Sequence, residues 1–189
     1  MKFGKRSKRP PLKPLAFALA LVCFFIYANL TAETTAHKAE VTLLPDDKLL
    51  SELVKDISEA NTSVHIAMYM FKSYRNETNG AGLIKRALIK AADRGAEVYV
   101  VLDQTGEDDF VEKENKKLGK ELKEHNIIVV YDKEDVRMHT KCAVIDREIT
   151  YIGSHNYTNS AMKYNREMTA KIVSKGASED AIRHIFSVK

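Results

Sequence analysis

The stretch Ser63-Val-His-Ile-Ala-Met-Tyr-Met-Phe71 decides the fold class of this chain of 189 residues. Apolar side chains fall on both faces of a strand formed here, which is typical of a sheet that helices cover on both sides. Glu97-Val-Tyr-Val-Val-Leu102 has the same pattern. Between the two, residues Gly80 to Arg94 have apolar side chains at helical spacing, and Gly95 is placed as the helix stop. These segments predict a strand, a helix and a second strand packed together.

The residues before Ser63 predict one more strand and one more helix. Glu40 to Leu44 is a short strand-like stretch that Pro45 closes, and Asp46 or Asp47 is positioned to cap a helix after it. The apolar face of that helix consists of Leu49, Leu50, Leu53, Val54 and Ile57. The order strand, helix, strand, helix, strand is the signature of an α/β domain.

The residues after Leu102 predict a charged helix, four further strands and a last helix that Ser178 caps. Residues 103–126 are highly charged with only a weak apolar stripe, so we expect a helix that faces solvent. The strands are expected at residues 127–131, 138–146, 148–153 and 167–173. We therefore expect a single α/β domain with a mixed, mostly parallel β-sheet flanked by helices on both faces.

The positive charge of the chain is concentrated at its amino terminus. The formal net charge is +4, but residues 1–32 hold six of the 30 basic groups and none of the 26 acidic ones. Residues 33–189 therefore have 24 basic against 26 acidic groups, a net charge of −2. The basic excess does not indicate a generally basic surface on the rest of the chain.

Residues 1–32 have the order of an export signal, with basic, then apolar, then small and polar residues. Fourteen apolar residues run from Leu15 to Ala28, fewer than the roughly 20 that span a bilayer. We expect a cleaved signal, with cleavage near Ala32 or Ala36. An uncleaved membrane anchor and a buried core helix are the alternatives. With a signal or an anchor, the domain of residues 33–189 is exported, and is periplasmic or attached to the membrane.

Polar residues with the chemistry of phosphate transfer gather in the last third of the chain. His139 and Lys141 are two residues apart, so in a strand they share one face and set an imidazole beside a fixed cation. Ser154 and Asn156 are also two apart, after Gly153, and offer a hydroxyl and an amide on one side. These groups would hold a phosphate, with His139 at the phosphorus.

Glu167 supplies a carboxylate in the same part of the chain. A hydrogen bond to the second imidazole nitrogen would fix which nitrogen of His139 faces the substrate. Each of these residues alone is more often a structural or surface group. The combination is far more specific.

The combination resembles the HxKxxxxD signature with a downstream GSxN that defines the phospholipase D superfamily. His139, Lys141 and Asp146 match the first part, and Gly153-Ser-His-Asn156 matches the second. The segment from about residue 41 to residue 102 is also similar to that family. Single-motif chains of this size with an export signal most resemble the small bacterial endonucleases of the superfamily.

The resemblance implies a metal-independent phosphodiesterase in which the motif histidine attacks phosphorus and forms a phosphohistidine intermediate. The resemblance assigns His139 as the nucleophile, Lys141, Ser154 and Asn156 as phosphate ligands, and Glu167 as the carboxylate that orients His139. Asp146, the motif aspartate, is more structural than catalytic in this family and is the weakest of the catalytic candidates. The sequence has no HExxH, no CxxC and no carboxylates at ligand spacing. We therefore expect no metal and no cofactor.

The family's chemistry needs two histidines, one that attacks and one that protonates the leaving oxygen. This chain has one HxK motif and no internal repeat. Small single-motif members similar to this chain dimerise, so we expect a homodimer whose two-fold axis brings two copies of His139 together. His155, at the variable position of GSxN, is a further candidate for substrate contact.

Basic and aromatic residues near the motif favour nucleic acid, DNA and/or RNA, as the substrate. The candidates are Lys72, Arg75, Lys163, Arg137 and Arg166, with Tyr74, Tyr157 and Tyr164 nearby. We expect a non-specific exported endonuclease. One alternative is hydrolysis of a membrane phospholipid such as cardiolipin by a membrane-tethered dimer. Another is a non-catalytic nucleic-acid-binding protein for DNA uptake, against which the intact His139 and Lys141 argue.

Overall fold

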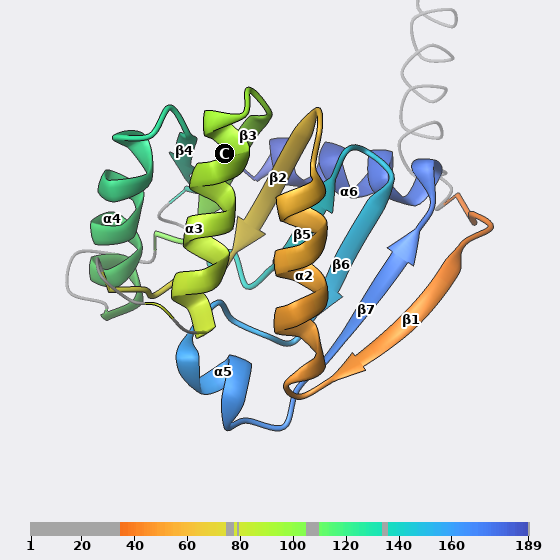
Figure 1. The fold of residues 1–189 in the computed structure, drawn as a ribbon, viewed down its shortest axis with the longest axis horizontal. Coiled ribbons are helices and arrows are strands. Elements are labelled where there is room, and N and C mark those ends of the chain that lie inside the picture. The colour runs from red at the N-terminus through yellow and green to blue at the C-terminus, as the bar shows by residue number, and fades with distance from the viewer. Residues whose placement is uncertain (1–34, 75–77, 79, 105–109, 134–135, 189) are drawn as a thin grey trace, which may run out of the picture. The chain divides into compact units, whose positions relative to one another are not determined.

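Seven strands form one sheet in the order β1-β7-β6-β5-β2-β3-β4, with helices packed against it (Figure 1). The computed structural model describes residues 35–74, 78, 80–104, 110–133 and 136–188. The strands are β1 (Glu40–Pro45), β2 (Ser63–Met68), β3 (Glu97–Leu102), β4 (Ile128–Tyr131), β5 (Lys141–Ile145), β6 (Ile149–Gly153) and β7 (Met168–Val173). The helices are α2 (Lys48–Glu59), α3 (Gly80–Asp93), α4 (Phe110–Lys123), α5 (Asn159–Lys163) and α6 (Lys175–Ser187).

Two apolar layers, one on each face of the sheet, form the core. Helices α2, α3 and α4 cover one face, where they bury Leu53, Ile84 and Leu118. Helix α6 packs on the other face through Ile182 and Ile185 (Figure 1). Strands β2 and β3 are buried along almost their whole length, which confirms the burial on both faces that their apolar pattern predicted.

The expected α/β class, with a mixed sheet between helices, is confirmed, but the sheet is not mostly parallel. Only β2–β3 and β3–β4 pair in parallel, and the other four neighbouring pairs are antiparallel. Crossover helices α3 and α4 join the parallel strands. By contrast, β5 and β6 are joined by a tight turn at Asp146 and Arg147, with φ of 51° and 59°. Such a turn joins antiparallel strands only.

Helix α4 differs from the solvent-facing helix expected within residues 103–126. It packs on the sheet and buries Leu118 and Leu122. The same buried side holds Asn115 and Gly119. A polar and a small residue add nothing to an apolar stripe, so the pattern underestimated how much of this helix is covered.

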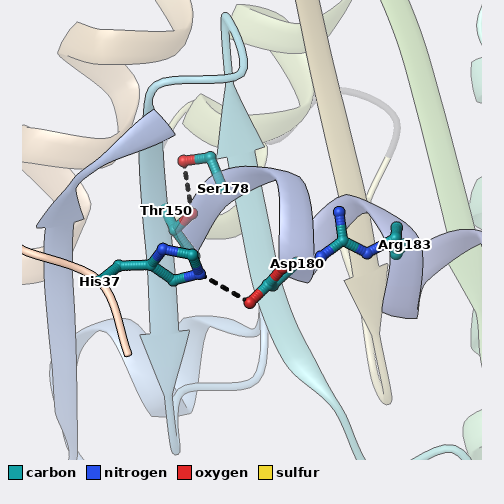
Figure 2. A network of polar contacts seen from close by, with 5 residues as sticks. All are labelled: His37, Thr150, Ser178, Asp180 and Arg183. Atoms are coloured by element: carbon teal, nitrogen blue, oxygen red, sulfur yellow. Dashed lines mark hydrogen bonds and ion pairs between the residues drawn. The ribbon is translucent and has the colours of Figure 1, made fainter. Parts of the chain in front are cut away.

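Helix α6 begins at Lys175, earlier than the start predicted at Ser178. Ser178 instead lies inside the helix, fully buried, with its hydroxyl 2.9 Å from that of Thr150 on β6 (Figure 2). The imidazole of His37 lies 2.8 Å from the carboxylate of Asp180 on the same helix (Figure 2). These contacts tie α6 to the sheet and to the segment before β1.

Two further expectations concern the chain outside these elements. The predicted signal or anchor at residues 1–32 lies outside the described residues. Among the helices that the structure describes, none is both long enough and apolar enough to cross a bilayer. The short helix α5, capped by the Thr158 hydroxyl that accepts from the Ala161 amide at 3.2 Å, was not predicted.

Candidate active site

The residues predicted to handle phosphate lie at one edge of the sheet. His139 precedes β5 and Lys141 begins it, while Ser154 follows β6 and Glu167 precedes β7. Strand β6 runs antiparallel to both β5 and β7, so its end lies beside their starts. Topology therefore brings together side chains that are up to 28 residues apart in the sequence.

The ring of Tyr69, directly after β2, packs against the motif residues. Its centroid is 4.5 Å from that of the His139 ring and 4.7 Å from Nζ of Lys141. The Arg137 guanidinium carbon lies 5.8 Å from the same centroid. The Tyr69 backbone N–H donates to the Thr140 carbonyl at 2.8 Å. This bond holds the backbone of Tyr69 beside the motif.

Lys141 is a buried cation whose direction is fixed. Its ammonium donates to the carbonyl of His139 at 3.0 Å. Burial lowers the pKa of Lys141, and the carboxylates of Glu167 and Asp103 oppose this only in part. A positive charge held in this way suits a non-bridging phosphate oxygen.

His139 is exposed and lies near two cations, Lys141 and Arg137. Its pKa lies below the ordinary 6.5, first because of partial burial and then because of the nearby Lys141 and Arg137. The neutral imidazole is the nucleophilic form. The neighbourhood of His139 therefore favours the form that attack on phosphorus requires.

Ser154 and Glu167 are hydrogen-bonded to each other across the β6–β7 pair. The Ser154 hydroxyl donates to one Glu167 oxygen, and Asn165 Nδ2 donates to the other at 3.0 Å. The sequence had led us to expect a hydrogen bond between Glu167 and His139. In this chain Glu167 instead receives its hydrogen bonds from Ser154 and Asn165. The reason is that Ser154 follows β6, the strand next to β7, whereas His139 precedes β5, which β6 separates from β7.

His155 does not reach toward a substrate, which corrects its prediction as a contact residue. Its side chain is 1% exposed. One ring nitrogen lies 2.7 Å from the Thr169 hydroxyl and the other 2.9 Å from the Asp46 carbonyl. Both polar atoms are thus used inside the protein. The neighbouring Asn156 is half-buried, and its side-chain oxygen has no hydrogen-bond partner among the described residues.

Asp146 lies at the opposite end of β5 from the site, roughly 17 Å along the strand from Lys141. Its carboxylate accepts the backbone N–H groups of Asn61, Thr62 and Ser63 at 2.8–3.2 Å, just where β2 begins. The motif aspartate thus caps the neighbouring strand. This position supports the structural role that the resemblance implied and corrects its inclusion among catalytic candidates.

Sequence reasoning missed two buried polar residues that support the site. Asp103, directly after β3, accepts the backbone N–H of Met138 at 2.7 Å, next to His139. Asn115 of α4 donates to the carbonyls of Tyr69 and Asp103 at 2.8 and 3.0 Å. Both residues are fully buried. Neither belongs to a motif, so only the tertiary structure links them to the site.

The predicted substrate-binding lysines lie on this side of the molecule beside exposed aromatic rings. Nζ of Lys72 is 4.4 Å from the Phe110 ring centroid and 5.5 Å from that of Tyr74. Lys163 lies 5.2 Å from the centroid of Tyr164. The third candidate, Arg75, lies outside the described residues. Within the described part of the chain, no three His, Cys, Asp or Glu side chains are grouped to hold a metal ion.

The mixed sheet, with a histidine and a lysine at the start of its middle strand, defines the class of protein: it has the fold of the phospholipase D superfamily. The solved structure of Nuc, a phospholipase D family member from Salmonella typhimurium, matches with a TM-score of 0.67 and 21% identity. The match covers 80% of this chain and 94% of Nuc. At that identity the likeness shows the fold alone.

The family follows from the sequence. Residues 53–188 match the model described as "Cardiolipin synthase, PLD-like domain", and the chain belongs to this family. It is 27% identical over 171 residues to the human mitochondrial cardiolipin hydrolase, covering 86% of this chain. It is 30% identical over 137 residues to a phospholipase D of Rickettsia prowazekii, covering 72% of this chain. The chain spans 60% of the length of each of these two relatives.

Proposed function

We propose that this protein is a metal-independent phosphodiesterase in which His139 attacks phosphorus and Lys141 binds a non-bridging phosphate oxygen. One observation carries the proposal. Both side chains pack against the ring of Tyr69 at the edge of the sheet where Ser154 follows β6 and Glu167 precedes β7. An imidazole with a lowered pKa, a fixed ammonium and a hydroxyl at one edge suit phosphoryl transfer through a covalent intermediate.

The reaction proceeds in two steps. First, a nitrogen of His139 bonds to phosphorus while the bond to the leaving oxygen breaks, and a second, protonated imidazole gives that oxygen its proton. Water then attacks the phosphohistidine, the second imidazole takes the proton from the water, and the P–N bond breaks to restore His139. Lys141, Ser154 and Asn156 stabilise the negative charge on the phosphate oxygens throughout.

The second imidazole comes from a second copy of the chain. Helix α6 contacts β6 at Thr150 but leaves part of its sheet face open, where Leu43, Ala170 and Ile152 form one row across β1, β7 and β6. Leu43 is 62% exposed and Ile152 is 48% exposed. We call this apolar surface the open sheet face. It adjoins the site because Met168, also exposed, directly follows Glu167, so a two-fold contact here brings two sites together.

Charge placed on the open sheet face tests the shared site. Leu43→Lys and Ile152→Lys should convert the dimer to a monomer in sedimentation and abolish phosphodiesterase activity. Ile128→Lys, an equally exposed apolar residue on the far strand β4, is the matched control. An active monomer in either test variant refutes the shared-site mechanism.

Nucleic acid, DNA and/or RNA, is the proposed substrate, and the enzyme is a non-specific endonuclease. The support comes from lysines paired with exposed rings, Lys72 with Tyr74 and Lys163 with Tyr164. Rings of this kind stack on unpaired bases while the lysines contact phosphates. Hydrolysis of a phospholipid such as cardiolipin is the second candidate, and the matched family and the human relative, both described by cardiolipin chemistry, favour it.

One experiment separates these candidates. The full-length chain and its His139→Ala variant are incubated in EDTA with single-stranded DNA, duplex DNA, RNA and cardiolipin vesicles. We expect nucleic-acid cleavage that is insensitive to EDTA and absent in the variant. Cleavage of cardiolipin alone refutes the nuclease, retention of DNA without cleavage indicates a binding protein, and loss of all activity in EDTA refutes the metal-independent mechanism.

Residues 1–32 are proposed to export the domain of residues 33–189 from the cytoplasm, as a cleaved signal or as an anchor. The basic, apolar and polar order of this segment supports the proposal. Export is tested by protease accessibility of the domain in intact spheroplasts. The mass of the mature protein then tells a signal from an anchor, and a domain that stays protected in the cytoplasm refutes export.

A further inference from the structure

A hollow of about 350 Å³ opens beside His139, and neither Ser154 nor Glu167 is among its described lining residues. It lies between the segment before β5 and the last turn of α6. The described residues that line it are Asp132, Lys133, Val136, Arg137, Met138, His139, Thr140, His184, Ser187 and Val188. Its volume is at the lower end of the range for small-ligand pockets.

The hollow combines positive charge with an apolar wall. Lys133 and Arg137 are exposed cations on its rim. The one carboxylate among the described lining residues, Asp132, is buried and accepts the backbone N–H of Gln104 at 2.6 Å. Val136, 68% exposed, offers an apolar surface beside these charges. A ligand that carries a phosphate and an apolar ring would match this lining.

A pair of polar side chains marks one wall of the hollow. Nε2 of His184, on α6, lies 3.3 Å from the hydroxyl of Thr140. Thr140 stands between His139 and Lys141 in the motif, so this wall is joined directly to the predicted nucleophile. An imidazole and a hydroxyl together donate and accept hydrogen bonds, as the sugar and base edges of a nucleotide require.

We propose that this hollow binds the nucleotide next to the scissile phosphate, with Arg137 and Lys133 on its phosphate and His184 with Thr140 on its sugar or base. The inference rests on the proposed nuclease function and adds to it a binding subsite for the strand. A phosphodiester held at His139 continues through a sugar to the following phosphate, and the adjoining hollow receives that continuation. Arg137 also acts on the imidazole of His139, whose pKa it lowers, so its charge lies close to the reacting group.

The test compares two substrates of the full-length chain. Bis(p-nitrophenyl) phosphate has one phosphate and no continuing strand, whereas a single-stranded oligodeoxynucleotide also fills the hollow. For Arg137→Gln and for His184→Ala, KM for the oligonucleotide should rise about tenfold more than KM for the small diester. His125→Ala, an exposed histidine after α4, is the matched control.

Binding gives a second readout that does not depend on turnover. In a His139→Asn background, Arg137→Gln should weaken oligonucleotide binding and reduce the slope of log affinity against log salt by about 0.7. The subsite is overturned if KM rises equally for the oligonucleotide and for the small diester, or if it rises for neither. Complete loss of small-diester hydrolysis in His184→Ala also overturns it, because His184 would then be the second catalytic imidazole. A wild-type chain that cleaves the diester and cardiolipin but no nucleic acid instead refutes the nuclease itself.

Discussion

The ring of Tyr69 lies against the ring of His139, with their centroids 4.5 Å apart and their planes inclined by 55°. Tyr69 follows β2 and His139 precedes β5, so the contact joins two neighbouring strands at the edge where the site forms. The same ring contacts the ammonium of Lys141. One aromatic side chain therefore sets the position of both residues of the HxK motif.

Removal of the Tyr69 ring should impair the chemical step more than substrate binding. Tyr69→Ala loses an aromatic contact and a cation–π contact worth about 1–2 kcal/mol together, so we expect kcat for bis(p-nitrophenyl) phosphate to fall about tenfold. Tyr69→Phe keeps the ring and should retain most of the activity. An equal loss in both variants would show that the hydroxyl, and not the ring, is what matters.

The acid limb of the pH profile should lie below the ordinary histidine pKa of 6.5. Burial, Lys141 and Arg137 all lower the pKa of His139, and attack on phosphorus requires the neutral imidazole. Neutral His139 therefore persists to lower pH than an unperturbed histidine would. The measurement is kcat/KM for the small diester against pH.

Loss of a neighbouring cation should move that limb in a defined direction. Arg137→Gln removes one cause of the lowered pKa, so the pKa of His139 rises and the acid limb moves to higher pH. Lys163→Gln is the control. It also removes one positive charge, beside Tyr164, but Lys163 is not among the groups that lower the pKa of His139. A limb that stays fixed in Arg137→Gln would mean that another group controls the profile.

Asp146 should act on stability and not on chemistry. Its carboxylate accepts three backbone N–H groups before and at the start of β2, and hydrogen bonds to a charged group contribute about 1.5–3 kcal/mol. Asp146→Ala should therefore lower the free energy of unfolding by about 2 kcal/mol or more in urea titrations, since φ of 51° at this position also disfavours alanine. Asp146→Asn tolerates that φ and keeps one acceptor oxygen, so it should cost less.

The contribution of Asp146 has a defined pH dependence. Burial raises its pKa, but the hydrogen bonds from Asn61, Ser63 and Thr62 outweigh burial and hold it below 3.8. A folded-state pKa below the unfolded value gives stability that is present above 3.8 and is lost as pH falls through the lower folded-state value. The stability gap between wild type and Asp146→Asn should accordingly close in acid. A stability difference that does not change with pH would show that the charge of the Asp146 carboxylate is not its cause.

The sequence predicted the elements whose apolar patterns are strong. Strand β3 and helix α3 appear within one residue of the expected bounds, because their buried faces are continuous. Strand β5 begins three residues later than expected, at Lys141, because the backbone N–H of Met138 bonds the Asp103 carboxylate and not a strand. A side-chain bond from a distant element leaves no local pattern, so only the tertiary structure reveals it.

Two histidines show where site prediction stops. His139 and His155 both stand in motif segments, yet the first is exposed beside Tyr69 and the second is buried. The sequence identifies the residue types and their spacing. The direction of the His155 side chain depends on its partners in the fold, the Thr169 hydroxyl on β7 and the Asp46 carbonyl after β1. Spacing in the sequence does not encode these contacts.

His155 should be required for folding stability and dispensable for binding substrate. His155→Ala leaves the Thr169 hydroxyl and the Asp46 carbonyl without their partner and opens a cavity, which should lower the free energy of unfolding by about 3 kcal/mol in urea titrations. His155→Asn retains one polar atom near the position of Nδ1 and should lose about half as much, since it can still bond Thr169. At a temperature where each variant is folded, KM for the oligonucleotide should match that of wild type. A large rise in KM without loss of stability would restore His155 as a substrate contact, and would mean that its ring leaves the Asp46 carbonyl when nucleic acid binds.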